Sequence, residues 1–254
     1  MRRMSSLEQR LLDIILSNLD RVLEFKRLDD APREIEALRE DPVFSYFIPW
    51  SRISSYVKAK IGGAYIVSLD RKLGDIYEEC VKEIVKTKLG LSDEDMQYSY
   101  VLKVGGRETE RKLDCKILLE DIQDKEARDR VERVIQQEAQ HMLHPKQYRG
   151  IGLEIRFCYQ IGDSKRIQAD LDMAKSLESD NILPVMLIFC NISLQSPIKR
   201  FRERSPWHVK EGLEAYKFLK KLTGFDLYNF LKSYRKVIMD KVEAIFERLE
   251  TVFK

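Results

Sequence analysis

Charged side chains interrupt two apolar segments of this sequence, where burial would make them costly. Asp114 lies within "KLDCKILL", and Glu154 and Arg156 lie within "GLEIRFCY". A buried charge is unfavourable unless it is paired or binds a metal. Because side chains alternate along a strand, Glu154 and Arg156 are expected to point to the same face. This pattern suits either a catalytic site or a purely structural pair of strands.

Two carboxylates on neighbouring strands could share a divalent cation. If the segments of Asp114 and Glu154 pair, their oxygens suit Mg2+, which takes further oxygen ligands from water and phosphate. Bound Mg2+ lowers the pKa of its water and neutralises charge on a phosphodiester. Either Arg156 or Lys165, at the strand–helix junction that follows, would stabilise that charge. The predicted chemistry is metal-dependent phosphodiester hydrolysis.

The same residues also have a structural explanation. Charged residues make up 34% of the chain, so an acid and a base two positions apart are not rare here. A strand at a sheet edge with one wet face would hold Glu154 and Arg156 without any catalysis. Glu78, on an upstream helix, is at least as well explained as an exposed helix position. Both explanations stay open at this level.

Basic side chains gather in two segments. In "SKRIQAD", donors of Lys165, Arg166 and Gln168 could face a phosphate at a helix N-terminus. The acids farther along, Asp170 and Asp172, are expected on the solvated face of that helix. A second segment, "KRFRERSPWHVK", is predicted to be a basic loop that contacts DNA or is simply solvated. Its candidate DNA-binding residues are Lys199, Arg200, Arg202, Arg204 and Trp207.

Composition sets broad bounds. The chain has 254 residues, 44% of them apolar, which suffices for one sizeable domain or two modest ones. A net charge of +3 does not by itself indicate nucleic-acid binding. No apolar run is long enough to cross a membrane, and no phosphate-binding glycine motif predicts a nucleotide cofactor. The four cysteines, which form no C-x-x-C pair, are expected to be reduced core thiols of a cytoplasmic protein: Cys80, Cys115, Cys158 and Cys190.

Hydrophobic periodicity predicts the elements that must position these residues. Helices are expected over 5–27, 29–41, 73–90, 125–144, 165–181, 209–224 and 225–254, and strands over 96–104, 107–121, 150–159 and 182–193. An irregular aromatic stretch is expected over 42–67, with a turn at Gly62-Gly63. The order predicts an α/β fold with a mixed central sheet of about four to five strands flanked by helices and helical N- and C-terminal segments. A helical segment, 1–60, would precede an α/β core with C-terminal helices, 61–254, in one continuous domain.

The spacing of these acids resembles a nuclease pattern. Asp114 followed by "EIR", with "GDIYE" on the helix upstream, is similar to the PD-(D/E)xK motif of type II restriction endonucleases. "EIRFCYQIGDSKRIQADLDMA", "LPVMLIFCNIS" and "EGLEAYKFLKKLTGFDLYNFL" resemble the ApaLI-like group, a likeness that covers the C-terminal two-thirds. The resemblance implies a restriction-endonuclease-like fold, Asp114 and Glu154 as metal ligands and Glu78 as an accessory acid. Two positions depart from the pattern: Leu113 replaces the Pro, and Arg156, which cannot act as a base, replaces the Lys.

The predicted function is therefore that of a Mg2+-dependent, site-specific endodeoxyribonuclease acting on double-stranded DNA. Cleavage of both strands at a symmetric sequence implies two sites related by a twofold axis, hence a homodimer. The N-terminal helices or the last helix are candidates for the dimer interface. The alternative is a non-catalytic α/β protein that binds nucleic acid, and a third hypothesis is a helical interaction protein.

Overall fold

The computed structural model describes residues 4–25, 28–41, 43–104, 107–140, 146–160 and 164–251. The chain divides into two compact units, an α/β unit of residues 1–7 and 77–231 and a helical unit of residues 8–76 and 232–254. The sequence prediction placed a boundary after residue 60 and kept the C-terminal helices with the α/β core. In the structure, the last helix belongs with the N-terminal helices.

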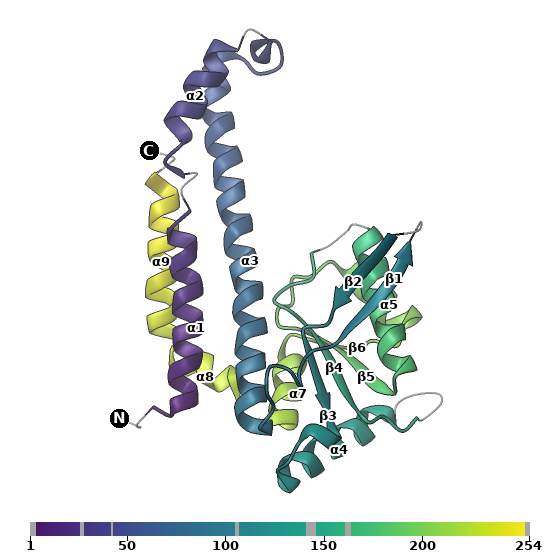
Figure 1. Ribbon diagram of the computed structural model, residues 1–254. Helices are drawn as coiled ribbons and strands as arrows, with labels where there is room; N and C mark the ends of the chain where they lie inside the picture. The colour runs from purple at the N-terminus through teal and green to yellow at the C-terminus, as the bar shows by residue number, and fades with distance from the viewer. Residues whose placement is uncertain are drawn as a thin grey trace. The chain divides into compact units, whose positions relative to one another are not determined.

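The helical unit consists almost entirely of α-helices (Figure 1). Its elements are α1 (Ser6–Leu23), α2 (Ala31–Glu40), the 3-10 turns η2 (Phe44–Tyr46) and η3 (Trp50–Arg52), most of α3 (Ile53–Leu89), and α9 (Arg235–Thr251). The Tyr65 hydroxyl of α3 donates to the Ile245 carbonyl of α9 (3.1 Å), and Lys241 of α9 pairs with Asp20 of α1 (2.5 Å). The helices predicted over 5–27 and 29–41 are confirmed. Among the described residues, no helix is long and apolar enough to cross a membrane.

The prediction of an irregular segment over 42–67 is wrong for its second half. Helix α3 starts at Ile53 and continues through Gly62 and Gly63 without a turn. One apolar side chain in each helical turn is buried: Ile53, Val57, Ile61, Tyr65 and Leu69. Each glycine costs a helix about 1 kcal/mol, whereas burying one such side chain gives roughly 1.5–3 kcal/mol. The spacing of the apolar residues therefore outweighs the glycine pair.

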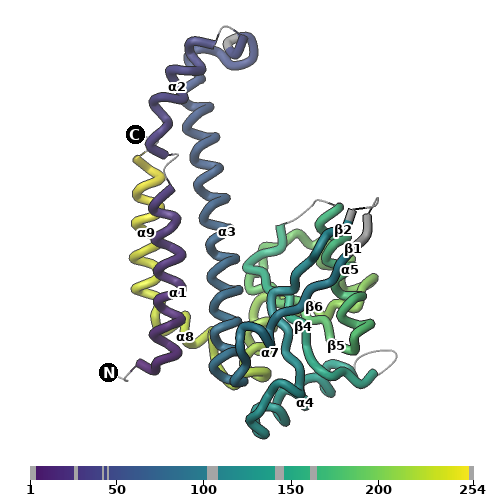
Figure 2. The backbone as a smooth tube through the Cα atoms, in the orientation of Figure 1, coloured from purple at the N-terminus to yellow at the C-terminus, as the bar shows by residue number. Residues whose placement is uncertain are grey.

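The α/β unit has a mixed central sheet and a separate hairpin, and Figure 2 traces its backbone with most of the strands and helices labelled. Its elements are β1 (Ser99–Val104), β2 (Arg107–Lys112), β3 (Cys115–Leu118), η4 (Leu119–Asp121), α4 (Lys125–Ala139), β4 (Gly150–Arg156), α5 (Ser164–Ser179), β5 (Ile182–Ile188), α6 (Gln195–Arg204), β6 (His208–Glu211), α7 (Leu213–Thr223) and the short α8 (Leu227–Ser233). The sheet order is β3-β4-β5-β6, with β3 antiparallel to β4 and the other pairs parallel. The predicted α/β class, with a mixed sheet between helical terminal parts, is confirmed.

The segment predicted as one strand over 107–121 serves two sheets. Residues 107–112 pair with β1 in the hairpin, and the predicted turn at residues 105 and 106 lies outside the described residues. The chain leaves the hairpin at Leu113 and enters the central sheet as β3 at Cys115. Asp114 therefore sits at the break between the two strands, immediately before β3.

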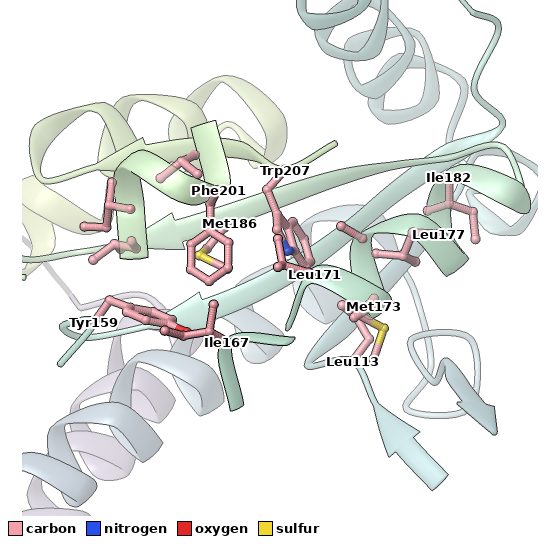
Figure 3. Close-up of a cluster of buried hydrophobic side chains, with 14 of the residues drawn as sticks. Leu113, Tyr159, Ile167, Leu171, Met173, Leu177, Ile182, Met186, Phe201 and Trp207 are labelled. Carbon is pink, nitrogen blue, oxygen red and sulfur yellow. The ribbon is translucent and has the colours of Figure 1, made fainter. Parts of the chain in front are cut away.

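A hydrophobic core holds α5 and α6 against the central sheet. All seven residues of β5 are buried, so both faces of this strand are covered. Met186 of β5 lies in a cluster with Leu171 and Leu177 of α5 and Phe201 of α6 (Figure 3). A Cβ at Gly152 of β4 would come within 2.8 Å of the Leu177 side chain. The glycine thus lets α5 approach β4 closely, and this brings the first turns of α5 next to the end of the strand.

Within the described residues, helix α6 and strand β6 were not predicted from the sequence. The predicted basic loop over 197–207 is helix α6, whose Ile198 and Phe201 are fully buried. The short strand β6 follows and pairs with β5, so the predicted helix over 209–224 begins only at Leu213. Only four residues form β6, too few for the alternating pattern to be recognised.

The prediction of four reduced thiols is wrong for two of the cysteines. Cys158 and Cys190 form a disulfide with a Cα–Cα distance of 5.3 Å, whereas Cys80 and Cys115 are free and buried. Strands β4 and β5 pair residues in the register Arg156↔Ile188. The two cysteines follow these residues at the same offset, so the register places them opposite each other. The pairing of two distant strands, rather than spacing along the chain, creates the bond.

Opening this disulfide is expected to destabilise the α/β unit. The bond closes a loop with a sequence separation of 32 residues, for which loss of the cross-link costs about 3–4 kcal/mol on the chain-entropy account. Urea unfolding with and without dithiothreitol measures this loss. A Cys158→Ser, Cys190→Ser variant should match the reduced wild type and should not respond to dithiothreitol. Equal unfolding free energies of oxidised and reduced wild type would contradict the expectation.

Candidate active site

The pairing of β3 with β4 brings the two predicted metal ligands together. The register Cys115↔Leu153 places Asp114 across from Glu154. The Asp114 carboxylate accepts a hydrogen bond from the backbone N–H of Ile155 (2.7 Å), which holds it at the end of the strand pair. The strand pairing assumed from the sequence is thus confirmed, although helix α4 lies between the two strands in the chain.

Arg156 links both acids. Its Nη1 donates to Oδ2 of Asp114 at 3.2 Å, and its Nη2 donates to Oε1 of Glu154. Glu154 and Arg156 lie on the same side of β4, as strand alternation requires. The buried Nε of Arg156 has no hydrogen-bond partner among the described residues. The guanidinium therefore compensates the two carboxylates but leaves one of its own donors unused.

Burial disfavours the ionised form of both carboxylates. Loss of solvent, together with the nearby charge of Glu78, raises the pKa of Asp114 to about 6 despite the opposing effect of Arg156. Burial and the charge of Asp114 also raise the pKa of Glu154, well above its ordinary value. Burial disfavours the charged guanidinium, but the two acids outweigh this and raise the pKa of Arg156. A further cation next to the acids would be favourable.

An open cleft of about 410 Å³ has Glu154 and Arg156 among its lining residues. It lies between β2, β4 and the first half of α5. Cationic side chains line it: Arg111, Lys112, Arg156, Lys165 and Arg166. Lys165 and Arg166 are exposed at the start of α5 and line the cleft. Gln168 is exposed on the same helix and donates to Asp172 (2.9 Å), but it does not line the cleft.

Asp170 is a residue of this cleft that the sequence analysis misplaced. It was expected on a solvated helix face, but it is only 8% exposed. Its Oδ2 accepts a hydrogen bond from the Tyr159 hydroxyl (2.6 Å), and its backbone carbonyl accepts one from the indole of Trp207 (2.8 Å). Burial raises the pKa of Asp170, although Arg156 and Arg166 act in the opposite direction. The sequence did contain a signal that Asp170 is buried. On the helix it lies next to Leu171 and Ala174, apolar residues that mark the buried face.

Glu78 approaches the same site from α3. It is paired with Lys82 one turn later, and its side chain is 36% exposed. Its charge raises the pKa of both Asp114 and Glu154, which places it within electrostatic range of the predicted metal ligands. Lys82, not singled out from the sequence, lowers the pKa of Asp114 in turn. The five predicted catalytic residues thus gather around one region of the α/β unit.

No family model, characterised protein or solved structure matches this chain. The resemblance to ApaLI-like restriction enzymes therefore stays a prediction from the quoted residues.

The predicted DNA-contact loop does not join the cleft. Lys199, Arg200, Arg202 and Arg204 are exposed on α6, which packs against β6, the sheet edge opposite β3. Arg202 pairs with Glu211 (3.4 Å), and Lys199 lies 3.8 Å from Glu203. Trp207 was expected to contact DNA, but it is 3% exposed and belongs to the core beneath α5 (Figure 3). Its indole N–H donates to the backbone carbonyl of Asp170. The prediction that Trp207 contacts DNA is therefore wrong.

Asp114 and Glu154 supply part of the ligand set that a hard divalent cation needs. Among the described residues, no group of three or more His, Cys, Asp or Glu side chains is arranged to hold a metal. Asp114 and Glu154 nevertheless offer two neighbouring carboxylates, and burial raises the pKa of both. Mg2+ is commonly bound through one or two carboxylates, with water and phosphate oxygens completing its shell. The two acids fit that mode if Arg156 releases at least one of them.

Proposed function

We propose that the protein is a Mg2+-dependent endodeoxyribonuclease that cuts double-stranded DNA at a specific sequence, with the character of a type II restriction enzyme. One observation carries this proposal. Asp114, immediately before β3, and the buried Glu154 of β4 meet beside a cleft whose lining includes five cationic side chains. Cationic walls suit the phosphate backbone, and paired acids suit a divalent ion.

Each side chain has a role in this proposal. Asp114 and Glu154 bind Mg2+, which when bound supplies an activated water and neutralises charge on the phosphate. Lys165 and Arg166 at the cleft surface bind phosphate oxygens and set the position of the DNA backbone. Arg156 or Lys165 stabilises the charge that builds on phosphorus. Arg156 keeps its proton and therefore acts through charge alone.

A homodimer is part of the proposal, because cutting both strands of a symmetric site needs two centres related by a twofold axis. The helical unit is our candidate for the interface. Its helix α9 exposes three large apolar side chains, Val237, Met239 and Phe246. We place the protein in the cytoplasm on the basis of its DNA substrate, although disulfides are uncommon there.

Non-catalytic binding of nucleic acid is the alternative, and the contacts of Arg156 favour it. A guanidinium shared by Asp114 and Glu154 satisfies both acids without any metal. In that case, the cationic side chains of the cleft would bind phosphates, and binding would weaken steeply with salt. Divalent ions would be unnecessary.

Plasmid digestion in three buffers distinguishes the candidates. With Mg2+, the nuclease is expected to convert supercoiled plasmid into discrete fragments whose ends share one sequence. With Ca2+, it should retard a duplex in a gel without cutting, and with EDTA it should do neither efficiently. Equal retardation in all three buffers without cutting would support the binding protein instead. Neither binding nor cutting would leave the helical interaction protein, with α9 as its docking element.

A further inference from the structure

We propose that Asp170 is a positioning residue of this site, which takes over the Arg156 guanidinium when a divalent cation binds to Asp114 and Glu154. The inference rests on the proposed metal site and adds a residue and a movement to it. Asp170 would act through Arg156 and would not itself bind the metal.

The guanidinium of Arg156 lies between the two acids. Arg156 donates to Asp114 and to Glu154, so its guanidinium occupies the position where a shared cation would bind. Two like charges a few ångströms apart in a partly buried site repel each other strongly. A divalent cation and this guanidinium therefore cannot both lie between the two carboxylates. Metal binding requires Arg156 to find another partner.

Asp170 is the available acceptor. It lines the same cleft as Arg156 and Glu154, and its charge contributes to raising the pKa of Arg156. The acceptor is also held in place on two sides. Tyr159 donates to its Oδ2 and Trp207 donates to its backbone carbonyl, so the carboxylate is fixed before Arg156 arrives. The buried Arg156 Nε, which has no partner among the described residues, is a donor that the present contacts leave unused.

Charge balance supports the same arrangement. Asp114, Glu154 and Asp170 carry three negative charges when ionised, and Arg156 carries one positive charge. Among these four residues the remaining two negative charges match one divalent cation, and the other charged residues of the cleft lining are not included in this count: Glu110, Arg111, Lys112, Lys165 and Arg166. Without Asp170 the loaded site would hold an excess positive charge in a partly buried position, which is unfavourable. Glu78 and Lys82 pair with each other and leave this balance unchanged.

A double-mutant cycle on the full chain tests the proposal, with Mn2+ binding measured by titration calorimetry in the absence of DNA. Asp170→Asn is expected to weaken Mn2+ binding at least tenfold, because the displaced Arg156 then has no carboxylate to receive it. In an Arg156→Gln background the same change should weaken binding less than threefold, because no guanidinium needs a new partner. Asp172→Asn, two residues away on the same helix and absent from the cleft lining, is the matched control and should bind Mn2+ as wild type does.

The results distinguish the role of Asp170 from metal binding and from nuclease activity. An equal loss in both backgrounds would show that Asp170 acts independently of Arg156, and no loss would remove its role; either result overturns the inference and leaves the proposed nuclease intact. Wild type that binds no Mn2+ would overturn both. Mn2+ binding with the expected coupling, but without DNA cleavage, would support the inference and remove the nuclease. Tyr159→Phe gives a second test that keeps Arg156 and Asp170, and it should weaken Mn2+ binding about threefold because Asp170 loses its hold. Unchanged binding in this variant, which retains the ring in the core, would count against the positioning role.

Discussion

Replacing Asp114 by Ala is expected to abolish cleavage of plasmid DNA in Mg2+, with a loss of rate of at least about 100-fold. Changes in the shell around metal ligands already cost about 10–100-fold, and Asp114 is itself one of the two proposed ligands. The change also removes the acceptor of one Arg156 hydrogen bond (3.2 Å) and of the Ile155 N–H (2.7 Å). Initial rates of supercoiled plasmid loss measure the effect.

Asp114→Asn separates the charge from these hydrogen bonds. Its amide oxygen can still accept from the Ile155 N–H, so the end of the strand pair should stay in place while the ligand charge is lost. Cleavage by this variant should be reduced nearly as far as by Asp114→Ala. Asp129→Asn, an exposed carboxylate on α4, is the control and should cut at the wild-type rate. If Asp114→Ala cuts as fast as Asp129→Asn, Asp114 has no catalytic role.

Replacing Arg156 by Met is expected to lower the free energy of unfolding by about 3–5 kcal/mol near pH 8, because it leaves two buried carboxylates without their counter-ion. The side chains of Asp114 and Glu154 are only 15% and 6% exposed. Solvent therefore cannot replace the guanidinium. Urea unfolding monitored by circular dichroism gives the loss.

The loss of unfolding free energy in Arg156→Met should become smaller as the pH is lowered towards 5. The folded-state pKa values of Asp114 and Glu154 are already raised by burial, to about 6 for Asp114, and removal of Arg156 raises them further. The destabilisation is thus fully present above these folded-state values. It declines below them, as the folded acids take up protons before the unfolded chain does. Arg202→Met, which removes a more exposed arginine paired with Glu211, should cost less than about 1 kcal/mol at either pH. A pH-independent loss in Arg156→Met would show that packing, rather than charge, explains the effect.

The elements with a strong repeating pattern were predictable from the sequence. The hairpin, strands β4 and β5 and helices α1, α4 and α5 follow from alternation or from helical spacing of apolar residues, and all are present. The errors fell where a local signal competed with packing. Gly62 and Gly63 suggested a turn, but burial of a side chain in every turn keeps α3 continuous. The charged surface of α6 suggested a loop, but two buried residues on its inner side, Ile198 and Phe201, make it a helix.

The candidate site was predictable only as a set of residue types. Asp114, Glu154 and Arg156 stood out because each interrupts an apolar strand. Asp170 and Trp207 were misassigned for a common reason, since each is polar or amphipathic and the sequence does not show which neighbours cover it. Trp207 lies under α5 and donates to Asp170, so the residue expected to contact DNA instead supports an acid of the cleft.

The amino-acid sequence alone determined the α/β class, most of the strands and helices, and the presence of charged residues within apolar segments, because these depend on patterns within short segments. The tertiary structure alone decided which of these segments meet. Strand register across β3, β4 and β5 places Asp114 beside Glu154 and joins Cys158 to Cys190, and helix packing buries Asp170. Such pairings depend on contacts between residues far apart in the chain, for which local periodicity contains no information.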